Sequence, residues 1–303
     1  MLRSRLAAAA AILIPLIGLL IADLRWNLNA PGIWIAPLGI LIGLMAASEM
    51  LDLLKTPGHR PLAWTVYFGV VLIIMAACAP MAWGLAGRPY PPTCPLGKLG
   101  WPLLGVAFSL MLAFVGEMKR YEQAGGVMVN LGLSVLTIVY VGVPIAFAAL
   151  LRQLHTNAWG MVALVSVVFI VKVSDSGAYF VGKSFGRNKL APRISPGKTI
   201  EGGLGGILAA VAASWVYFQF LAPQVVGSSM PRQSLWGVAL YGIVLALVGL
   251  AGDLSESLMK RDVARKDSSS WLPGLGGVLD IMDSLFFAMP AAYACWALGM
   301  VGP

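Results

Sequence analysis

Long apolar stretches separated by short polar segments fill almost the whole chain. Each stretch approaches the roughly 20 residues that a helix needs to cross the hydrocarbon of a bilayer. The pattern therefore predicts about nine spans, at 7–23, 34–53, 63–85, 101–117, 126–151, 160–182, 200–222, 236–253 and 276–300. We expect an all-α fold, a polytopic integral membrane helical bundle, because helices satisfy their own backbone groups in lipid.

Composition agrees with this fold class. Hydrophobic residues make up 59% of the 303 residues and charged residues 11%, whereas a soluble domain carries roughly 25% charged residues. Arg3 and Arg5 precede the first apolar run, which we interpret as a retained first helix because no small-x-small cleavage site follows it.

The distribution of Lys and Arg predicts the orientation. With the N-terminus in the cytoplasm, the segments on that side contain fifteen Lys and Arg residues and the opposite segments contain five. This bias predicts a multi-pass protein of the inner (cytoplasmic) membrane. The net charge of +8 is then explained by membrane orientation and by electrostatic attraction to anionic membrane lipid. We therefore expect no nucleic-acid partner.

Acidic residues gather late in the chain, near the predicted cytoplasmic ends of the last four spans. An ionised side chain at mid-membrane costs roughly 2.5–3.5 kcal/mol, so these carboxylates need compensation. Two i, i+3 pairs each point to one side of a helix and together would form an oxygen-rich pocket suited to Mg²⁺. The six acids are Asp175, Glu201, Asp253, Glu256, Asp280 and Asp283.

A structural interpretation of the same acids stays open. Asp280, Asp253 and Glu201 suit helix ends, and Asp is favoured near helix N-termini. Asp175 has Lys172 three residues before it, which suits a local ion pair.

Two basic, glycine-bearing loops, 181–206 and 252–277, flank these acids on the same predicted membrane side. Backbone N–H groups together with Lys and Arg can cradle phosphates. The SPGKT stretch is no P-loop, because the required upstream glycine falls on Pro192 and no predicted strand precedes it. Cations for phosphate beside carboxylates for metal favour phosphoryl or nucleotidyl transfer. The small residues of EGGLGG are typical of close helix packing.

Residues 252–285, GDLSESLMKRDVARKDSSSWLPGLGGVLDIMDSL, resemble the signature of the phosphatidate cytidylyltransferase (CDP-diacylglycerol synthase) family. The upstream stretches D-x-x-A-Y-x-x-G and S-P-x-K-T-x-E-G are similar to that family too. The likeness covers about residues 172–285. The matching positions in the first stretch are Ser257, Lys260, Arg261, Lys266, Asp267, Pro273, Gly276, Gly277, Asp280 and Asp283.

The resemblance implies that CTP and phosphatidic acid react to give CDP-diacylglycerol and pyrophosphate for phospholipid synthesis. It implies Mg²⁺, with a second cation beside it, at the active site facing the cytoplasm. Asp253, Asp280 and Lys260 would be catalytic. Asp253, Glu256, Asp280 and Asp283 would hold metal, and the substrate-binding residues would be Asp175, Lys198, Ser257, Arg261, Arg265 and Lys266.

Two positions depart from the family pattern. The His is Leu275 here, and the Arg between the two aspartates is Ile281. We expect these departures to be compensated, with Arg261 or Arg265 supplying the missing cation.

The positions of the acids and the basic loops divide the chain into two parts. Residues 1–158 would be N-terminal scaffold helices, which leaves a homodimer open, and 159–303 would be the catalytic helices with the two basic loops. Two other functions remain as alternatives, a CTP-dependent lipid kinase of the polyprenol type and an ion-coupled transporter, since intramembrane acids also mark ion pathways.

Overall fold

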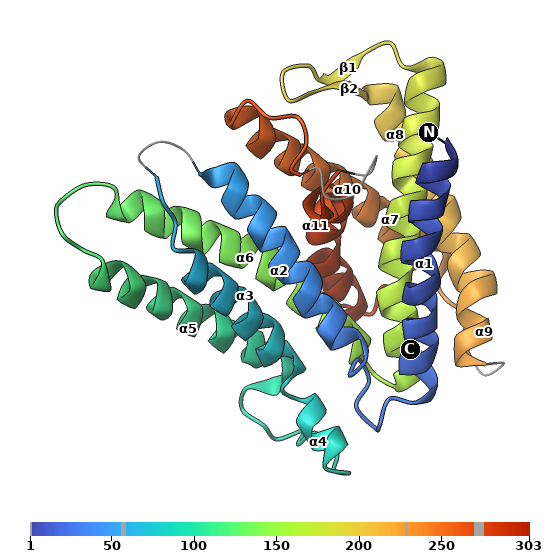
Figure 1. Cartoon of the computed structure of the whole chain (residues 1–303). Coiled ribbons are helices and arrows are strands. Elements are labelled where there is room, and N and C mark those ends of the chain that lie inside the picture. Colours follow the sequence, from blue (N-terminus) through green and yellow to red (C-terminus); the bar gives the residue numbers. More distant parts are fainter. Residues whose placement is uncertain (1, 56–58, 228–229, 270–275) are drawn as a thin grey trace. The chain divides into compact units, whose positions relative to one another are not determined.

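The computed structural model describes residues 2–55, 59–227, 230–269 and 276–303, with side chains from Leu13 onward (Figure 1). Contacts divide the chain into two compact units. The first unit comprises residues 1–150 together with 265–281, and the second comprises 151–264 together with 282–303. The predicted functional division at residue 158, into scaffold and catalytic helices, stays a prediction.

The first unit contains the helices of the N-terminal half. Small residues allow α3 (Ala63–Cys78) and α5 (Gly97–Lys119) to pack closely, because a Cβ added to Gly105 would lie 2.9 Å from the Ile73 Cα. The buried Asp23 carboxylate accepts hydrogen bonds from the backbone N–H groups of Gly32 and Trp34 and so fixes the turn after α1 (Leu2–Arg25). The helices are α1 (Leu2–Arg25), α2 (Ile35–Leu54), α3 (Ala63–Cys78), α4 (Met81–Leu85), α5 (Gly97–Lys119) and most of α6 (Val127–Arg152).

The second unit contains four long helical segments and a small hairpin. A buried aromatic cluster lies at its core, where the Trp296 ring stacks edge-on with Trp159 at 5.9 Å between centroids and meets Phe218 at 6.0 Å. The elements are α7 (Asn157–Phe185), β1 (Lys189–Ala191), β2 (Ser195–Thr199), α8 (Ile200–Val216), the π-turn η1 (Tyr217–Leu221), α9 (Ala222–Val226), α10 (Leu235–Asp262) and most of α11 (Val278–Ala297).

Each of the predicted spans falls on a helix, which confirms the all-α, polytopic membrane fold. Among the described residues, seven helices are long and apolar enough to cross a membrane, and the apolar α3 is shorter, at 16 residues. The chain is therefore a multi-pass membrane protein, while the predicted count of nine spans is not confirmed.

Three differences change the predicted elements by more than a shift of a few residues at a helix end. The span predicted at 63–85 breaks after Cys78, because Pro80 cannot donate a backbone hydrogen bond. The helix predicted to end at Asp253 continues to Asp262, supported by the i, i+4 ion pair of Glu256 with Lys260.

The third difference concerns the first basic loop. Only the part between α7 and α8 lies outside helices, and within it β1 pairs with β2 in antiparallel register, with Lys189 opposite Thr199 and Ala191 opposite Ser195. Two strands this short leave almost no periodic pattern in the sequence.

Candidate active site

Glycines bring α7 and α8 into close contact in the second unit. A Cβ added to Gly205 would lie 2.5 Å from the Val181 Cβ, and one added to Gly177 would lie 2.4 Å from the Ala209 Cβ. The predicted role of EGGLGG in helix packing is thus confirmed. The close approach sets the α7 residues from Ser174 to Lys183 beside the start of α8.

The β1–β2 hairpin is fixed to both neighbouring helices. The Thr199 hydroxyl accepts the Gly202 N–H at 3.1 Å and caps the start of α8. The Glu201 carboxylate accepts the backbone N–H groups of Arg187 and Asn188 at 3.1 Å each, and the Asn188 side-chain amide at 2.7 Å. Glu201 therefore has the structural role that the helix-end interpretation predicted.

The far side of the hairpin is tied to α10, because Arg261 Nε donates to the Ile194 carbonyl at 3.2 Å. This bond joins a predicted phosphate-binding cation to the turn between the strands. The hairpin is thereby held at both its base and its tip.

A cavity of about 500 Å³ lies between α7, α8, the hairpin and α10. Lys198 reaches across it to Asp253, with 2.6 Å between ammonium and carboxylate. Its wall combines cations, carboxylates, hydroxyls and glycines, which is the donor set expected for a phosphate-bearing ligand with a cation. The polar lining residues are Ser174, Asp175, Tyr179, Lys183, Ser195, Lys198, Thr199 and Asp253.

A second polar cluster lies where α7, α10 and α11 meet. Lys172 forms an ion pair with Asp175 at 3.5 Å and donates to the Ser284 hydroxyl at 3.2 Å, and that hydroxyl donates to Asp175 at 3.1 Å. The predicted local pair of Lys172 and Asp175 is confirmed, and it extends to α11.

Asp283 lies at the same junction, within electrostatic reach of Asp253, Asp175 and Lys172. Gly252 permits this approach of α10 to α11, because a Cβ there would lie 2.5 Å from the Asp283 carbonyl oxygen. The structure thus brings Asp175, Lys198, Asp253 and Asp283 together within one unit.

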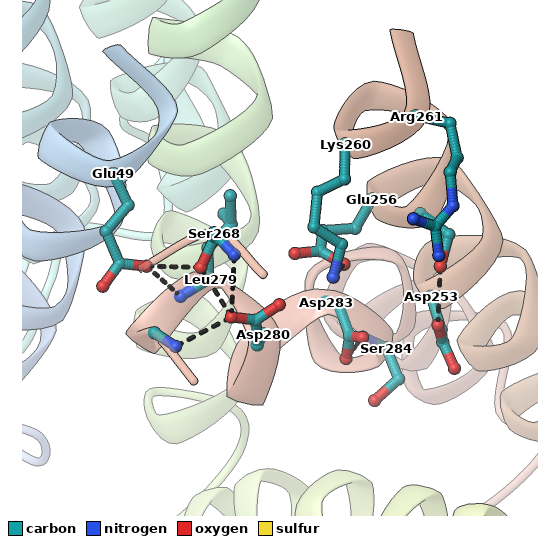
Figure 2. Close-up of polar contacts among 12 residues, drawn as sticks. Glu49, Asp253, Glu256, Lys260, Arg261, Ser268, Leu279, Asp280, Asp283 and Ser284 are labelled. Carbon is teal, nitrogen blue, oxygen red and sulfur yellow. Dashed lines mark hydrogen bonds and ion pairs between the residues drawn. The ribbon is translucent and has the colours of Figure 1, made fainter. Parts of the chain in front are cut away.

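Glu256 and Lys260 form a buried pair on α10. Their side chains are 1% and 12% exposed, and their charged groups are in direct contact (Figure 2). Ser257 donates to Asp253 at 3.5 Å on the same helix. Arg261, Arg265 and Lys266 are exposed.

In the first unit, Asp280 has structural contacts at the start of α11. Its Oδ2 accepts the Ser268 hydroxyl at 2.7 Å, the Gly277 N–H at 2.7 Å and the Ser268 N–H at 3.2 Å (Figure 2). The helix N-terminal role that the sequence left open for Asp280 is therefore present. Ile281 follows it in α11, and Leu275 lies outside the described residues.

Mg²⁺ fits the residues of the second unit. Asp253 and Asp283 are like-charged carboxylates within electrostatic reach of each other, and Mg²⁺ usually takes one or two carboxylates plus substrate phosphates. Among the described residues, no three His, Cys, Asp or Glu side chains converge as a self-sufficient metal cage. The predicted four-carboxylate metal set stays a prediction.

The sequence predicted no site role for Lys183, Ser174 or Glu49, whereas Thr199 belongs to the S-P-x-K-T-x-E-G stretch that resembles the family. Lys183 and Ser174 line the cavity, and the sequence signal that could have found them is their position on the same helix as Asp175. Glu49 contacts a segment more than 200 residues away, which no local pattern in the sequence indicates.

The comparisons with known proteins show the family of this chain. The cytidylyltransferase family matches residues 6–298, so the chain belongs to the cytidylyltransferase family. It is 34% identical to a protein of Haemophilus influenzae named phosphatidate cytidylyltransferase, over 61% of this chain and 62% of that protein.

Proteins with the same name show similar likeness in other bacteria. The one from Bacillus subtilis is 38% identical over 56% of this chain and 59% of its own length. The one from Chlamydia pneumoniae is 30% identical over 83% and 78%. The chain thus spans about three fifths of the length of the first two relatives and more of the third.

Proposed function

We propose that this protein is a phosphatidate cytidylyltransferase, which converts CTP and phosphatidate to CDP-diacylglycerol and pyrophosphate. The observation that carries the proposal is the second unit's cavity, where Lys183 and Lys198 accompany Asp175 and Asp253. Membership of the cytidylyltransferase family supports CTP as the nucleotide substrate, and the name that the relatives share supports phosphatidate as the lipid substrate.

The reaction needs positioning and charge neutralisation more than a strong base. A phosphate oxygen of phosphatidate is already anionic and would attack the α-phosphorus of CTP in line. The new P–O bond forms as the bond from the α-phosphorus to the bridging oxygen of the β-phosphate breaks, and that oxygen leaves with pyrophosphate.

Different cavity residues would position the phosphates and neutralise their charge. Lys198 would exchange its ion pair with Asp253 for the triphosphate, and Lys183 would neutralise charge that develops on the leaving pyrophosphate. Ser195 and Thr199 offer hydroxyls to phosphate oxygens. Mg²⁺, when bound by Asp253 and Asp283, would supply further charge neutralisation across the reacting phosphates.

The membrane setting suits the lipid substrate. We propose that the cavity opens to the cytoplasm from the inner membrane, where CTP is available. The acyl chains would then stay in lipid while the head group reaches Lys198 and Asp253. The predicted roles of Ser257, Arg261, Arg265 and Lys266 in substrate binding belong to this proposal.

Product identity tests the proposal. Purified protein would be incubated with Mg²⁺, CTP labelled in the cytidine or in the γ-phosphate, and either phosphatidic acid or polyprenol. We expect a cytidine-labelled lipid from phosphatidic acid and release of the γ-label as pyrophosphate. Transfer of the γ-label to polyprenol would instead identify a lipid kinase and overturn the proposal.

A further inference from the structure

A cavity of about 500 Å³ lies in the first unit, close to the end of α2 and the start of α3, two helices that lie side by side (Figure 1). Its described lining residues all belong to this unit, and none of them lines the cavity of the second unit. They include the basic side chains of Lys55, His59 and Arg60. The cavity therefore collects positive charge without taking part in the site described above.

His59 contributes an enclosed nitrogen to this cavity. Its Nδ1 is buried and makes no hydrogen bond to any part of the chain that the structure describes. A buried polar atom without a partner is destabilising, and such atoms in proteins are normally paired. An imidazole nitrogen that carries hydrogen donates readily to an oxygen of an anion. The position of His59 thus favours a ligand with oxygen acceptors.

Arg60 is the neighbouring cation, and its backbone is fixed to another helix. Its N–H donates to Asn130 Oδ1 at 2.7 Å, and Asn130 lies in the first turn of α6. No carboxylate among the residues that the structure describes pairs with the exposed Arg60 guanidinium. This guanidinium is therefore available to a planar or tetrahedral oxyanion, for which arginine has suitable geometry.

Lys55 directly follows α2 and adds a third basic group. Its ammonium lies 2.6 Å from Asp52 Oδ1, and the two side chains are 68% and 55% exposed. An ion pair as exposed as this one contributes little to stability. Lys55 can therefore exchange the Asp52 carboxylate for a ligand phosphate at small cost.

The rest of the lining suits the apolar part of a lipid. Leu51, Pro61 and Ala63 line the cavity together with the aromatic ring of Tyr67, and tyrosine is enriched where a bilayer meets water. The Lys and Arg bias places this end of α2 on the cytoplasmic side. Basic pockets between transmembrane helices on that side are typical of sites for anionic lipid headgroups.

We propose that this cavity binds an anionic phospholipid, whose phosphate is held by Lys55, His59 and Arg60 while its apolar part lies against Leu51 and Ala63. Free phosphate shares the chemistry of the headgroup, but only a lipid also uses the apolar lining. The site goes beyond the proposed cytidylyltransferase reaction, and its test does not depend on the product of that reaction.

The test uses the full-length protein in an uncharged detergent, with a fluorescent short-chain phosphatidylglycerol as the probe. This lipid is not a substrate of the proposed reaction, and its affinity is measured by fluorescence polarisation. We expect Arg60→Gln to raise the dissociation constant about 10-fold or more, the scale of one hydrogen bond between charged groups. Asp52→Asn should lower the dissociation constant, because the Lys55 ammonium loses its competing carboxylate.

The matched control for lost charge is Lys119→Gln. Lys119 is an exposed cation at the end of α5, in the same unit and on the same predicted side, and it does not line the cavity. The control should leave the dissociation constant unchanged. Equal weakening by Arg60→Gln and Lys119→Gln would show general attraction to positive charge and would overturn the site.

Two substitutions of His59 test the enclosed nitrogen. His59→Phe keeps a ring without a nitrogen, whereas His59→Asn keeps a donor near the position of Nδ1. We expect His59→Phe to weaken probe binding and His59→Asn to retain most of it, with thermal unfolding as the check that both variants fold. Unchanged affinity in His59→Phe and Arg60→Gln, or no binding by the wild-type protein, would overturn the proposal.

Competition distinguishes the two sources of phosphate. An excess of inorganic phosphate should leave the probe bound, because phosphate cannot use the apolar lining, and unlabelled phosphatidylglycerol should displace it. Displacement by inorganic phosphate at the same concentration as the lipid would identify a free-phosphate site and overturn the lipid assignment. Should Arg60→Gln not fold, the opposite shifts expected for Asp52→Asn and His59→Phe decide.

Discussion

The carboxylates near the helix ends have different partners in this protein, and each partner indicates the role of its carboxylate. Asp253 meets the Lys198 ammonium in the cavity, Asp280 accepts hydrogen bonds at the start of a helix, and Glu201 holds the hairpin. In sequence these acids look equivalent, because each lies near the end of an apolar stretch. Their environment therefore decides which substitutions affect chemistry and which affect folding.

Asp253→Asn should reduce turnover by at least about 100-fold, the scale on which single preorganised charges contribute to catalysis. The amide keeps the volume but loses the charge that pairs with Lys198. Turnover is measured over a Mg²⁺ titration at saturating CTP. The control is Asp262→Asn, an exposed acid at the end of the same helix, and near-normal turnover of Asp253→Asn would remove Asp253 from the site.

Lys260→Ala should unfold the protein at lower temperature, because it removes the ammonium beside the buried Glu256 carboxylate. Breaking such a pair typically costs about 3–5 kcal/mol. The double variant with Glu256→Gln should recover most of that stability, measured by thermal unfolding in the same detergent. A double variant that is stable but still cannot use CTP would assign Lys260 the direct role predicted from sequence.

At the scale of elements, the helix positions were predictable because hydropathy alone specifies a membrane helix. The break at Pro80 also has a sequence signal, which the apolar run on both sides concealed. The continuation of α10 past Asp253 was missed, since its last turns are polar and hydropathy gives no signal there. Their cohesion comes instead from the Glu256–Lys260 pair.

The hairpin and the contacts of Glu49 could not be predicted from the sequence pattern, each for its own reason. β1 and β2 together are too short to show a strand period. The bonds from Glu49 to Val278 and Leu279 join residues about 230 positions apart. The basic residues around Asp253 were found from sequence because glycines, cations and acids gather within short stretches.

Gly205→Ala should destabilise the α7–α8 contact. The added Cβ would lie 2.5 Å from the Val181 Cβ, an atom fixed to the backbone, and overpacking of this kind typically costs about 1–3 kcal/mol. Gly203→Ala on the same helix is the matched control, since its nearest atom would be Leu250 Cδ2 at 3.8 Å. The control should be neutral or stabilising by up to about 1 kcal/mol from helix propensity. Equal unfolding temperatures for both variants would contradict close packing at Gly205.

At the scale of the whole molecule, the charge distribution predicts which membrane side holds each loop. The hairpin and the segment that contains Ser268 each connect two predicted spans. The Lys and Arg bias places both of these connecting segments on the cytoplasmic side. Cys94, in the loop between α4 and α5, lies on the opposite predicted side. The proposed use of cytosolic CTP depends on this assignment.

Cysteine labelling tests it with a reporter that the chain already contains. The Tyr90 hydroxyl hydrogen-bonds to the Cys94 sulfur and, with nearby backbone N–H groups, holds the pKa of this thiol below its usual value. The reactive thiolate is therefore present at a lower pH than in an ordinary cysteine. With Cys78 and Cys295 replaced by Ala, a membrane-impermeant maleimide should label Cys94 in intact cells. Tyr90→Phe should move that labelling to higher pH, because the thiol loses its main stabilising partner.

Two introduced cysteines then report the other side of the membrane. In a background that also carries Cys94→Ala, Ser195→Cys in β2 and Ser269→Cys after α10 should react only after the membrane is opened. A positive-inside bias of fifteen to five leaves little room for a mixed result, because orientation is set for the whole bundle at once. Labelling of either introduced cysteine in intact cells, together with protection of Cys94 in the first background, would show that the topology is the opposite of the predicted one. The cavity of Lys198 and Asp253 would then face away from cytosolic CTP.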